Sequence, residues 1–176
     1  MSIATVTTLL LLGLSKAQHY ADLWDDEQII VSYKSGEVRS LDTFKYGKFR
    51  TKIKAVNKQG TCTSFFTFFE GPDWAPEKWN EIDFDIVPSV RGSTISTNII
   101  FGDGEVRHER HLYTSGIEPS NQWHTYEIEW TPYGIKWIVD GTPVRETSKF
   151  SSDIDLVDKE HSIMMNFWTP EYDPWR

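Results

Sequence analysis

Three carboxylates stand at alternate positions in the segment WNEIDFDIV, which spans residues 79–87. Glu81, Asp83 and Asp85 are separated from one another by single apolar residues. Successive side chains of a β-strand point to opposite faces, so a strand here would place all three acids on one face. Neighbouring negative charges repel, which favours retention of a proton by one of them near neutral pH. The pattern therefore indicates a site for proton transfer and carboxylate chemistry.

Glycoside hydrolysis is one reaction that needs such a group of acids. It uses two carboxyl groups across the scissile bond, about 5–5.5 Å apart in retaining enzymes and about 6.5–9.5 Å apart in inverting ones. Glu81 and Asp85 would lie roughly 13 Å apart at Cα, at about 3.3 Å per residue. Strand curvature and convergent rotamers must therefore close the gap. Asp83 between them could hydrogen-bond the nucleophile and separate the pKa values of the pair.

The alternation also fits an ordinary strand whose acids face solvent and whose apolar residues lie in the core. Trp79 favours a binding site instead, because it would share the acids' face and a solvated face seldom carries Trp. Asn98 in TNIIF, and Asn166 and Trp168 in MNFW, repeat the combination of amides with aromatic or apolar residues. Ring faces and amide hydrogen bonds are how proteins hold neutral sugars.

The elements that must position these residues are short strands. Period-two alternation and β-branched or aromatic residues dominate beyond residue 18, with little that predicts a helix. Asp140-Gly141 is a strong signal for a two-residue hairpin. With residues 79–87, we expect strands at 47–55, 62–69, 93–101, 123–130, 135–139, 142–146 and 162–168. Roughly nine such strands, without repeats or linkers, predict a single all-β sandwich or barrel.

Length and charge narrow the function classes. A chain of 176 residues suits one domain with a sizeable core. The net charge of −8 argues against nucleic acid, which requires a basic face, and is compatible with a neutral polysaccharide. The eight tryptophans indicate either a large core or a cleft in which rings stack on a ligand.

The N-terminal segment predicts secretion. Residues 1–17 contain an apolar stretch with Ser15 and Ala17 at the −3 and −1 positions of a cleavage site, so we expect a signal peptide cut after Ala17. A buried first segment is the alternative. The stretch is too short to span a membrane, and no other stretch resembles a span. Cys62 is the single cysteine, which excludes an intrachain disulfide and suggests a small buried apolar residue.

The motif WNEIDFD resembles the W-x-E-[IL]-D-[IF]-E strand of glycoside hydrolase family 16, especially bacterial lichenases and xyloglucan transglycosylases. Further segments occur in the family's order and spacing over most of residues 36–168, namely GEVRSLDTFKYGKFRTKIKA, TSFFTFFEGP, WHTYEIEWTPYGIKWIVDG and SIMMNFW. The resemblance implies a concanavalin A-like jelly roll of two curved antiparallel sheets across residues 18–176. Its concave face would bind an extended β-glucan. The protein would hydrolyse this glucan with retention of configuration.

The resemblance also implies roles for individual residues. Glu81 would be the nucleophile, Asp83 the assisting carboxylate and Asp85 the acid/base, with Trp79 as a sugar platform. Six more residues match positions that line the family's cleft: Arg39, Phe66, Phe68, Asn98, Asn166 and Trp168. We expect no metal at the site and no cofactor, and the sequence gives no support for the family's structural calcium.

Three departures from the family pattern matter. Asp85 stands where the family has glutamate, which would retract the proton donor by roughly 1–1.5 Å, about one carbon–carbon bond. A misplacement of that size can lower the rate about a hundredfold. A bulge does not restore the acid, because the next residue is Ile86. Ile100 replaces a cleft tyrosine, and the chain stops before the family's closing strand, so we expect a fragment or a compact variant lacking terminal strands.

Three functions follow as alternatives. The first is an endo-β-glucanase acting on a 1,3-1,4- or 1,3-linked glucan. The second is a glucan-binding protein in which Asp85 has weakened catalysis, and the third is a transglycosylase. In each case we expect a secreted monomer whose partner is a β-glucan, with neither nucleic acid nor membrane as a partner.

Overall fold

The computed structural model describes residues 35–71, 75, 78–88, 94–102, 106–108, 111–113, 119, 122–151 and 157–169. Within these ranges the chain forms eleven β-strands, and no helix has the length and apolar character needed to cross a membrane. The strands are β1 (Gly36–Phe44), β2 (Gly47–Ile53), β3 (Cys62–Phe68), β4 (Asn80–Val87), β5 (Thr94–Gly102), β6 (Val106–His108), β7 (His111–Tyr113), β8 (His124–Thr131), β9 (Gly134–Val139), β10 (Thr142–Ser148) and β11 (His161–Trp168).

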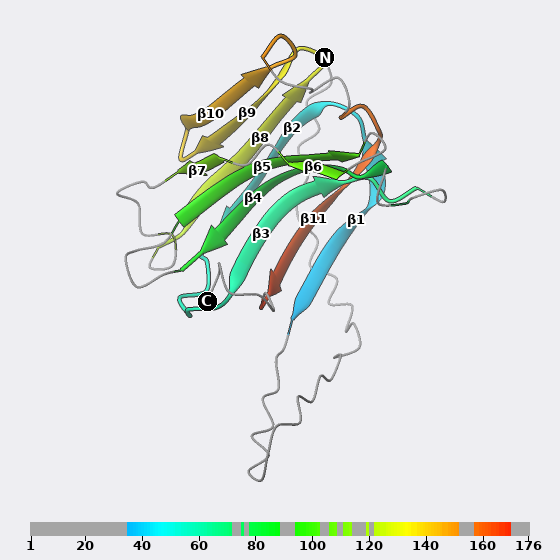
Figure 1. The fold of residues 1–176 in the computed structure, drawn as a ribbon. Helices are drawn as coiled ribbons and strands as arrows, with labels where there is room; N and C mark the ends of the chain where they lie inside the picture. Colours follow the sequence, from blue (N-terminus) through cyan, green and yellow to red (C-terminus); the bar gives the residue numbers. More distant parts are fainter. Residues whose placement is uncertain are drawn as a thin grey trace.

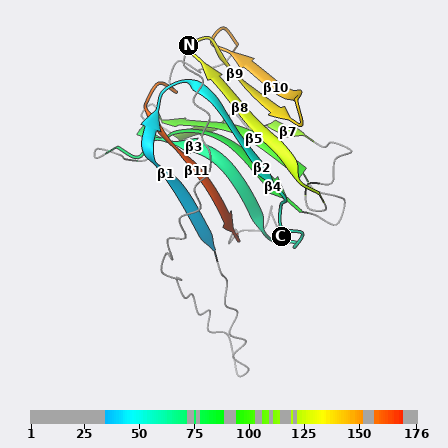
Figure 2. The ribbon, with the colours of Figure 1, turned by 180° about the vertical axis from the view of Figure 1, so that it is seen from behind.

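The strands form two antiparallel sheets that pack in layers (Figure 1). The large sheet has the order β1-β11-β3-β4-β5-β6, with β7 also pairing with β5. The small sheet has the order β10-β9-β8-β2 and lies in front when the molecule is seen from behind (Figure 2). Strands β3, β4 and β5 bend along their length (Figure 1). The predicted all-β jelly-roll sandwich is confirmed.

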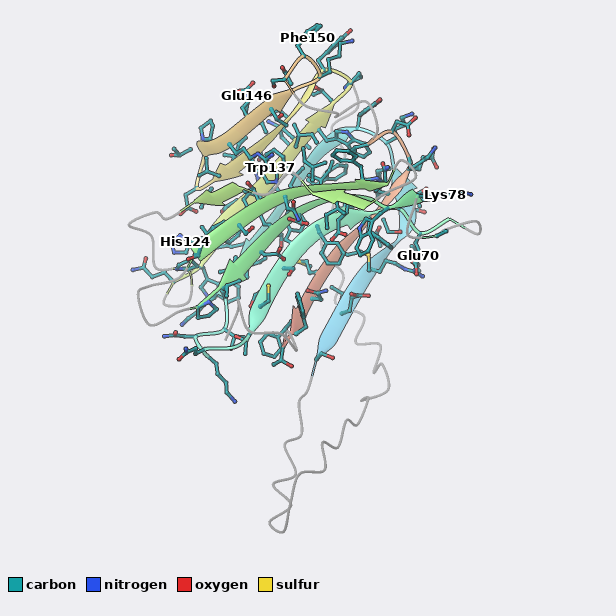
Figure 3. All side chains as sticks on the ribbon, in the orientation of Figure 1. Glu70, Lys78, His124, Trp137, Glu146 and Phe150 are labelled. Carbon is teal, nitrogen blue, oxygen red and sulfur yellow. The ribbon has the colours of Figure 1, made fainter. Side chains whose placement is uncertain are left out.

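The core fills the space between the sheets, because each strand turns its apolar set inward. β4 contributes Ile82, Phe84 and Ile86, all fully buried, and the small sheet contributes Trp130 and Trp137. Burying one large apolar side chain stabilises the fold by about 1.5–3 kcal/mol. Figure 3 shows side chains of both sheets gathered around the labelled Trp137. Two of the tryptophans therefore belong to the core.

The outer face of the small sheet carries paired charges. β2 and β8 place Lys48 opposite Glu129 and Arg50 opposite Glu127. The Nζ of Lys48 lies 3.1 Å from a carboxylate oxygen of Glu129, and the Nε of Arg50 lies 2.5 Å from one of Glu127. The hydrogen bonds of Lys48 to Glu129 and Glu127 raise its pKa. Two basic residues of β2 are thus paired with acids of β8.

The predicted hairpin at Asp140-Gly141 joins β9 to β10. Both residues have positive φ, 48° and 80°, as a type I′ turn requires. The Asp140 carboxylate accepts a hydrogen bond from the backbone N–H of Thr125 at 2.8 Å and lies 2.6 Å from Nδ1 of His124. This carboxylate therefore ties the turn to the start of β8.

The expected strands all occur, with ends that differ by one or two residues. Strands β1, β6 and β7 were not among them. β1 lies at an edge of the large sheet with most of its residues exposed, so its sequence lacks the alternation that marks a half-buried strand. The expected signal peptide at residues 1–17 and the last residues of the chain lie outside the described residues.

Candidate active site

The predicted site residues share the face of the large sheet that lies opposite the core. Strand register places them in rows that run across β1, β11, β3, β4 and β5. The row of Asp83 contains Arg39, Met164, Phe66 and Asn98; the row of Asp85 contains Glu37, Asn166, Ser64 and Ser96; and the row of Glu81 contains Ser162, Phe68 and Ile100. Period-two alternation alone predicts this sharing of one face.

The acidic face is not an ordinary solvated surface. Asp83 is only 3% exposed, and its neighbours in register, Phe66 and Asn98, are 7% exposed each. Solvent therefore reaches the middle of the row poorly. The alternative of three acids on a solvated outer face does not fit this burial.

Glu81 is held by the aromatic residue that precedes it on the same face. The indole Nε1–H of Trp79 donates to Oε2 of Glu81 across 2.6 Å. The Trp79 ring meets Phe68 edge to face, with ring centroids 6.2 Å apart. Its backbone carbonyl accepts the N–H of Gly102 at 2.8 Å. Both the backbone and the ring of Trp79 are thus fixed beside the carboxylate.

The pKa of Glu81 is raised to about 7. Burial is the largest cause; the hydrogen bond from Trp79 opposes it, and the negative charges of Asp85 and Glu37 raise the pKa further. Glu81 is thus partly protonated near neutral pH, chiefly because of its burial and less because of the neighbouring acids. The raised pKa belongs to the acid that the resemblance assigns as nucleophile.

Asp85 is held by β3. The Oγ of Ser64 donates to Oδ1 of Asp85 at 2.6 Å, and the thiol of Cys62 donates to the same oxygen at 3.6 Å. The indole Nε1–H of Trp168 donates to Oγ of Ser64 at 3.3 Å. In register, Phe68 lies opposite Glu81 and Ser64 lies opposite Asp85, so Cys62 lies still farther from the Glu81 row. These bonds fix the Asp85 carboxyl against β3.

Two amide oxygens on this face are buried and have no hydrogen-bond partner among the described residues. They are Oδ1 of Asn98 and Oδ1 of Asn166. Buried polar atoms in native proteins almost always have partners, so each of these oxygens can accept a hydrogen bond from a donor that reaches it. A sugar hydroxyl is such a donor.

The chain matches the model of Glycosyl hydrolases family 16 over residues 6–175. It belongs to this family. A β-glucanase of Brevibacillus brevis is 30% identical over 137 residues, which are 78% of this chain and 50% of that protein. A xylanase/β-glucanase of Ruminococcus flavefaciens is 34% identical over 136 residues, 77% of this chain and 16% of that protein. The solved Bacillus licheniformis β-glucanase has 28% identity and a TM-score of 0.66, covering 79% of this chain and 61% of that one.

The resemblance to glycoside hydrolase family 16 is thereby confirmed, together with its fold. The chain spans about half the length of the Brevibacillus relative. The roles that the family implies for Glu81, Asp83 and Asp85, and for the cleft residues, stay predictions.

Further residues of this family 16 chain take part in the site without having been predicted. Ser64 and Cys62 contact Asp85, and Glu37 accepts a hydrogen bond from Nδ2 of Asn166 at 3.2 Å. Alternation could have found Ser64 and Cys62, because they share a face of β3 with Phe66 and Phe68. Cys62 is fully buried, as expected, but it is more than a packing residue.

The edge of the site carries an ion pair. Arg39 on β1 pairs with Glu70, which follows the end of β3. Figure 3 places Glu70 and Lys78 at the end of the large sheet where β3 ends and β4 begins. Arg39 is therefore on the predicted face, and its charge is neutralised by a residue of the loop before β4. Among the described residues, no group of three or more His, Cys, Asp or Glu side chains could hold a metal ion.

Proposed function

We propose that this chain hydrolyses O-glycosidic bonds in a β-glucan by a retaining, double-displacement mechanism. The observation that carries the proposal is the arrangement of β4, in which Glu81 and Asp85 flank Asp83 on one face and each has its own hydrogen-bond donor. The family supports the reaction class, and the names of the relatives support the glucan as substrate.

In the first step the Glu81 carboxylate attacks the anomeric carbon while the protonated Asp85 gives its proton to the leaving oxygen. The glycosidic bond breaks, and the sugar becomes an ester of Glu81. In the second step Asp85 takes a proton from water, which attacks the anomeric carbon and releases Glu81. Asp83 lies between the two groups on the same face and is the assisting carboxylate of this proposal.

The ionisation of Glu81 depends on Asp85, whose negative charge raises the pKa of Glu81. The hydrogen bond from Trp79 favours the ionised form of Glu81, whereas burial and the charge of Asp85 favour its protonated form. The form active in the first step has the charge on Glu81 and the proton on Asp85. With the pKa of Glu81 at about 7, we expect activity to decline as the pH falls through that value.

The substrate is a neutral chain held by rings and amides. Trp79, Phe68 and Trp168 supply aromatic surface, and Asn98 and Asn166 supply the unpartnered oxygens for sugar hydroxyls. The 1,3-1,4- or 1,3-linked glucan that the family resemblance implies stays the predicted substrate.

Release of reducing sugar from lichenan and laminarin tests the proposal. Wild-type protein should release sugar from at least one of them. Glu81→Gln, which preserves size and hydrogen bonding, should abolish release while glucan binding persists. Activity retained by Glu81→Gln would contradict the assignment.

A glucan-binding function with weak catalysis is the second candidate, favoured by one observation. The short Asp85 carboxyl accepts hydrogen bonds from the Ser64 hydroxyl and the Cys62 thiol, which favour its ionised form over the protonated form that the first step needs. Affinity for lichenan without sugar release would favour this function. Transfer to another sugar stays a prediction, which product analysis with an added acceptor tests. Secretion, the monomeric state, the single domain at residues 18–176 and the absence of a cofactor also stay predictions.

A further inference from the structure

Three buried polar side chains lie at the start of β4, beneath the site. Thr67 on β3, Asn80 on β4 and His161 on β11 are at most 2% exposed. Burying such groups is unfavourable unless each finds a hydrogen bond. Thr67 Oγ1 lies 2.8 Å from Nδ1 of His161, and Nε2 of His161 lies 3.3 Å from Oδ1 of Asn80. Together they form a buried polar chain, Thr67–His161–Asn80.

The direction of each hydrogen bond follows from the partners of Asn80. Its Nδ2 donates to the carbonyl oxygen of Trp79 at 3.1 Å, and its Oδ1 accepts the backbone N–H of Lys159 at 3.5 Å. Because Oδ1 can only accept, Nε2 of His161 must carry the hydrogen. Burial lowers the pKa of His161 to about 3, so the ring is neutral and its bare Nδ1 accepts from the Thr67 hydroxyl.

The ring of His161 is also fixed from the side of the small sheet. The Trp130 ring lies against it, with centroids 4.7 Å apart and planes tilted by 33°. The histidine therefore has one orientation, set by packing on one side and by two hydrogen bonds on the other. A change in the position of such a residue therefore changes the positions of the groups that it contacts.

The buried polar chain ends on Trp79, whose indole contacts Glu81. The Trp79 carbonyl accepts hydrogen bonds from the N–H of Gly102 and from the Asn80 amide. Its indole Nε1–H donates to Glu81 at 2.6 Å. A small displacement of this backbone would move the indole away from the carboxylate.

We propose that His161 is a positioning residue, which acts through Asn80 to fix Trp79 so that the indole N–H stays on Glu81. The inference rests on the proposed function only where it concerns catalysis by Glu81. The structural part, a coupling from the core histidine to the indole, is independent of that function.

Three variants test the coupling. His161→Leu removes the donor to Asn80, whereas His161→Gln keeps an N–H group close to the position of Nε2. Ile163→Val is the matched control, because residue 163 is on the core side of the same strand and outside the buried polar chain. The readouts are the indole ¹⁵N–¹H resonance of Trp79, assigned with Trp79→Phe, the titration of the Glu81 carboxyl by ¹³C NMR, and kcat and KM on lichenan.

His161→Leu should shift the Trp79 resonance and move the Glu81 titration to higher pH, because the carboxylate loses a donor. Its kcat should fall about 10- to 100-fold, as expected for a displaced catalytic group. His161→Gln should restore most of the wild-type Trp79 resonance, Glu81 titration and kcat. Ile163→Val should leave all three unchanged.

An unchanged Trp79 resonance and Glu81 titration in folded His161→Leu would overturn the inference. If His161→Leu does not fold, Thr67→Val is the decisive variant, because it removes the hydroxyl that donates to Nδ1. An unchanged Trp79 resonance in Thr67→Val would also overturn the inference. Wild-type protein that is inactive on all glucans would contradict the proposed function, while the two NMR readouts would still decide the coupling.

Discussion

The indole N–H of Trp79 donates to a carboxylate oxygen of Glu81 across 2.6 Å, from a position two residues earlier in the chain. The spacing places both side chains on the same face of the sheet. The bond opposes burial, which together with the charge of Asp85 raises the pKa of Glu81 to about 7. The ionisation state of Glu81, the proposed nucleophile, therefore depends on Trp79, which would also stack on a sugar.

Replacing Trp79 by Phe should make Glu81 harder to ionise. The ring remains, but the donor is lost. A hydrogen bond to a charged group contributes about 1.5–3 kcal/mol, and one pKa unit corresponds to about 1.4 kcal/mol. The acid limb of the kcat/KM profile should therefore move upward by roughly one pH unit. A profile identical to that of the wild type would mean that the indole does not control ionisation.

Lengthening Asp85 to Glu should raise the rate of hydrolysis. The added methylene extends the carboxyl toward the bond that it protonates, and correct placement can be worth about a hundredfold in rate. We expect kcat to increase while affinity for lichenan, measured by calorimetry, stays within about twofold. Equal or lower kcat in Asp85→Glu would show that the aspartate is already well placed.

Removing the hydroxyl of Ser64 should change the pH dependence through Asp85. The hydroxyl donates to the carboxylate and favours its ionised form. In Ser64→Ala the basic limb of the kcat profile should move to higher pH, because Asp85 keeps its proton longer. Cys62→Val is the matched comparison and should have a smaller effect, since a thiol 3.6 Å away is a weak donor. A larger shift of the basic limb in Cys62→Val than in Ser64→Ala would contradict the conclusion that the Ser64 hydroxyl is the stronger donor.

Acid should destabilise the protein through His161. The pKa of this ring is lowered by burial to about 3 in the folded state and is about 6.5 in unfolded chains. Between these values only the unfolded chain binds the proton, so stability is complete above about pH 6.5 and falls toward pH 3. From pH 6.5 to 4.5 the loss should be roughly 2–3 kcal/mol.

Urea unfolding of wild-type protein and His161→Gln at several pH values measures this contribution. Other groups titrate in the same range, so the difference between the two proteins isolates the histidine. The wild type should lose more stability than the variant on acidification. Equal losses would show that His161 takes up no proton on unfolding.

Much of the site could be predicted from the sequence because strand periodicity fixes which side chains share a face. Once residues 79–87 were assigned to a strand, the acids had to lie together, and the same parity placed Phe66 and Phe68 on one face of β3. The edge strand β1 was missed because its exposed residues give no alternation.

Contacts between strands could not be predicted, because they depend on register and not on periodicity. The bond from Ser64 to Asp85 exists because the two residues are opposite each other in the β3–β4 pairing. The contact of His161 with Asn80 joins residues that are 81 positions apart in the chain. The raised pKa of Glu81 depends first on burial, which only the folded structure defines.

Trapping of the covalent intermediate tests the central claim most directly. An activated 2-deoxy-2-fluoro glucan oligosaccharide slows the second step, so the sugar ester should accumulate on the nucleophile. After proteolysis, mass spectrometry should find the added sugar on the peptide that contains Glu81, and Glu81→Gln should carry none. Steady turnover of lichenan with no adduct, or with the adduct on another residue, would contradict the account.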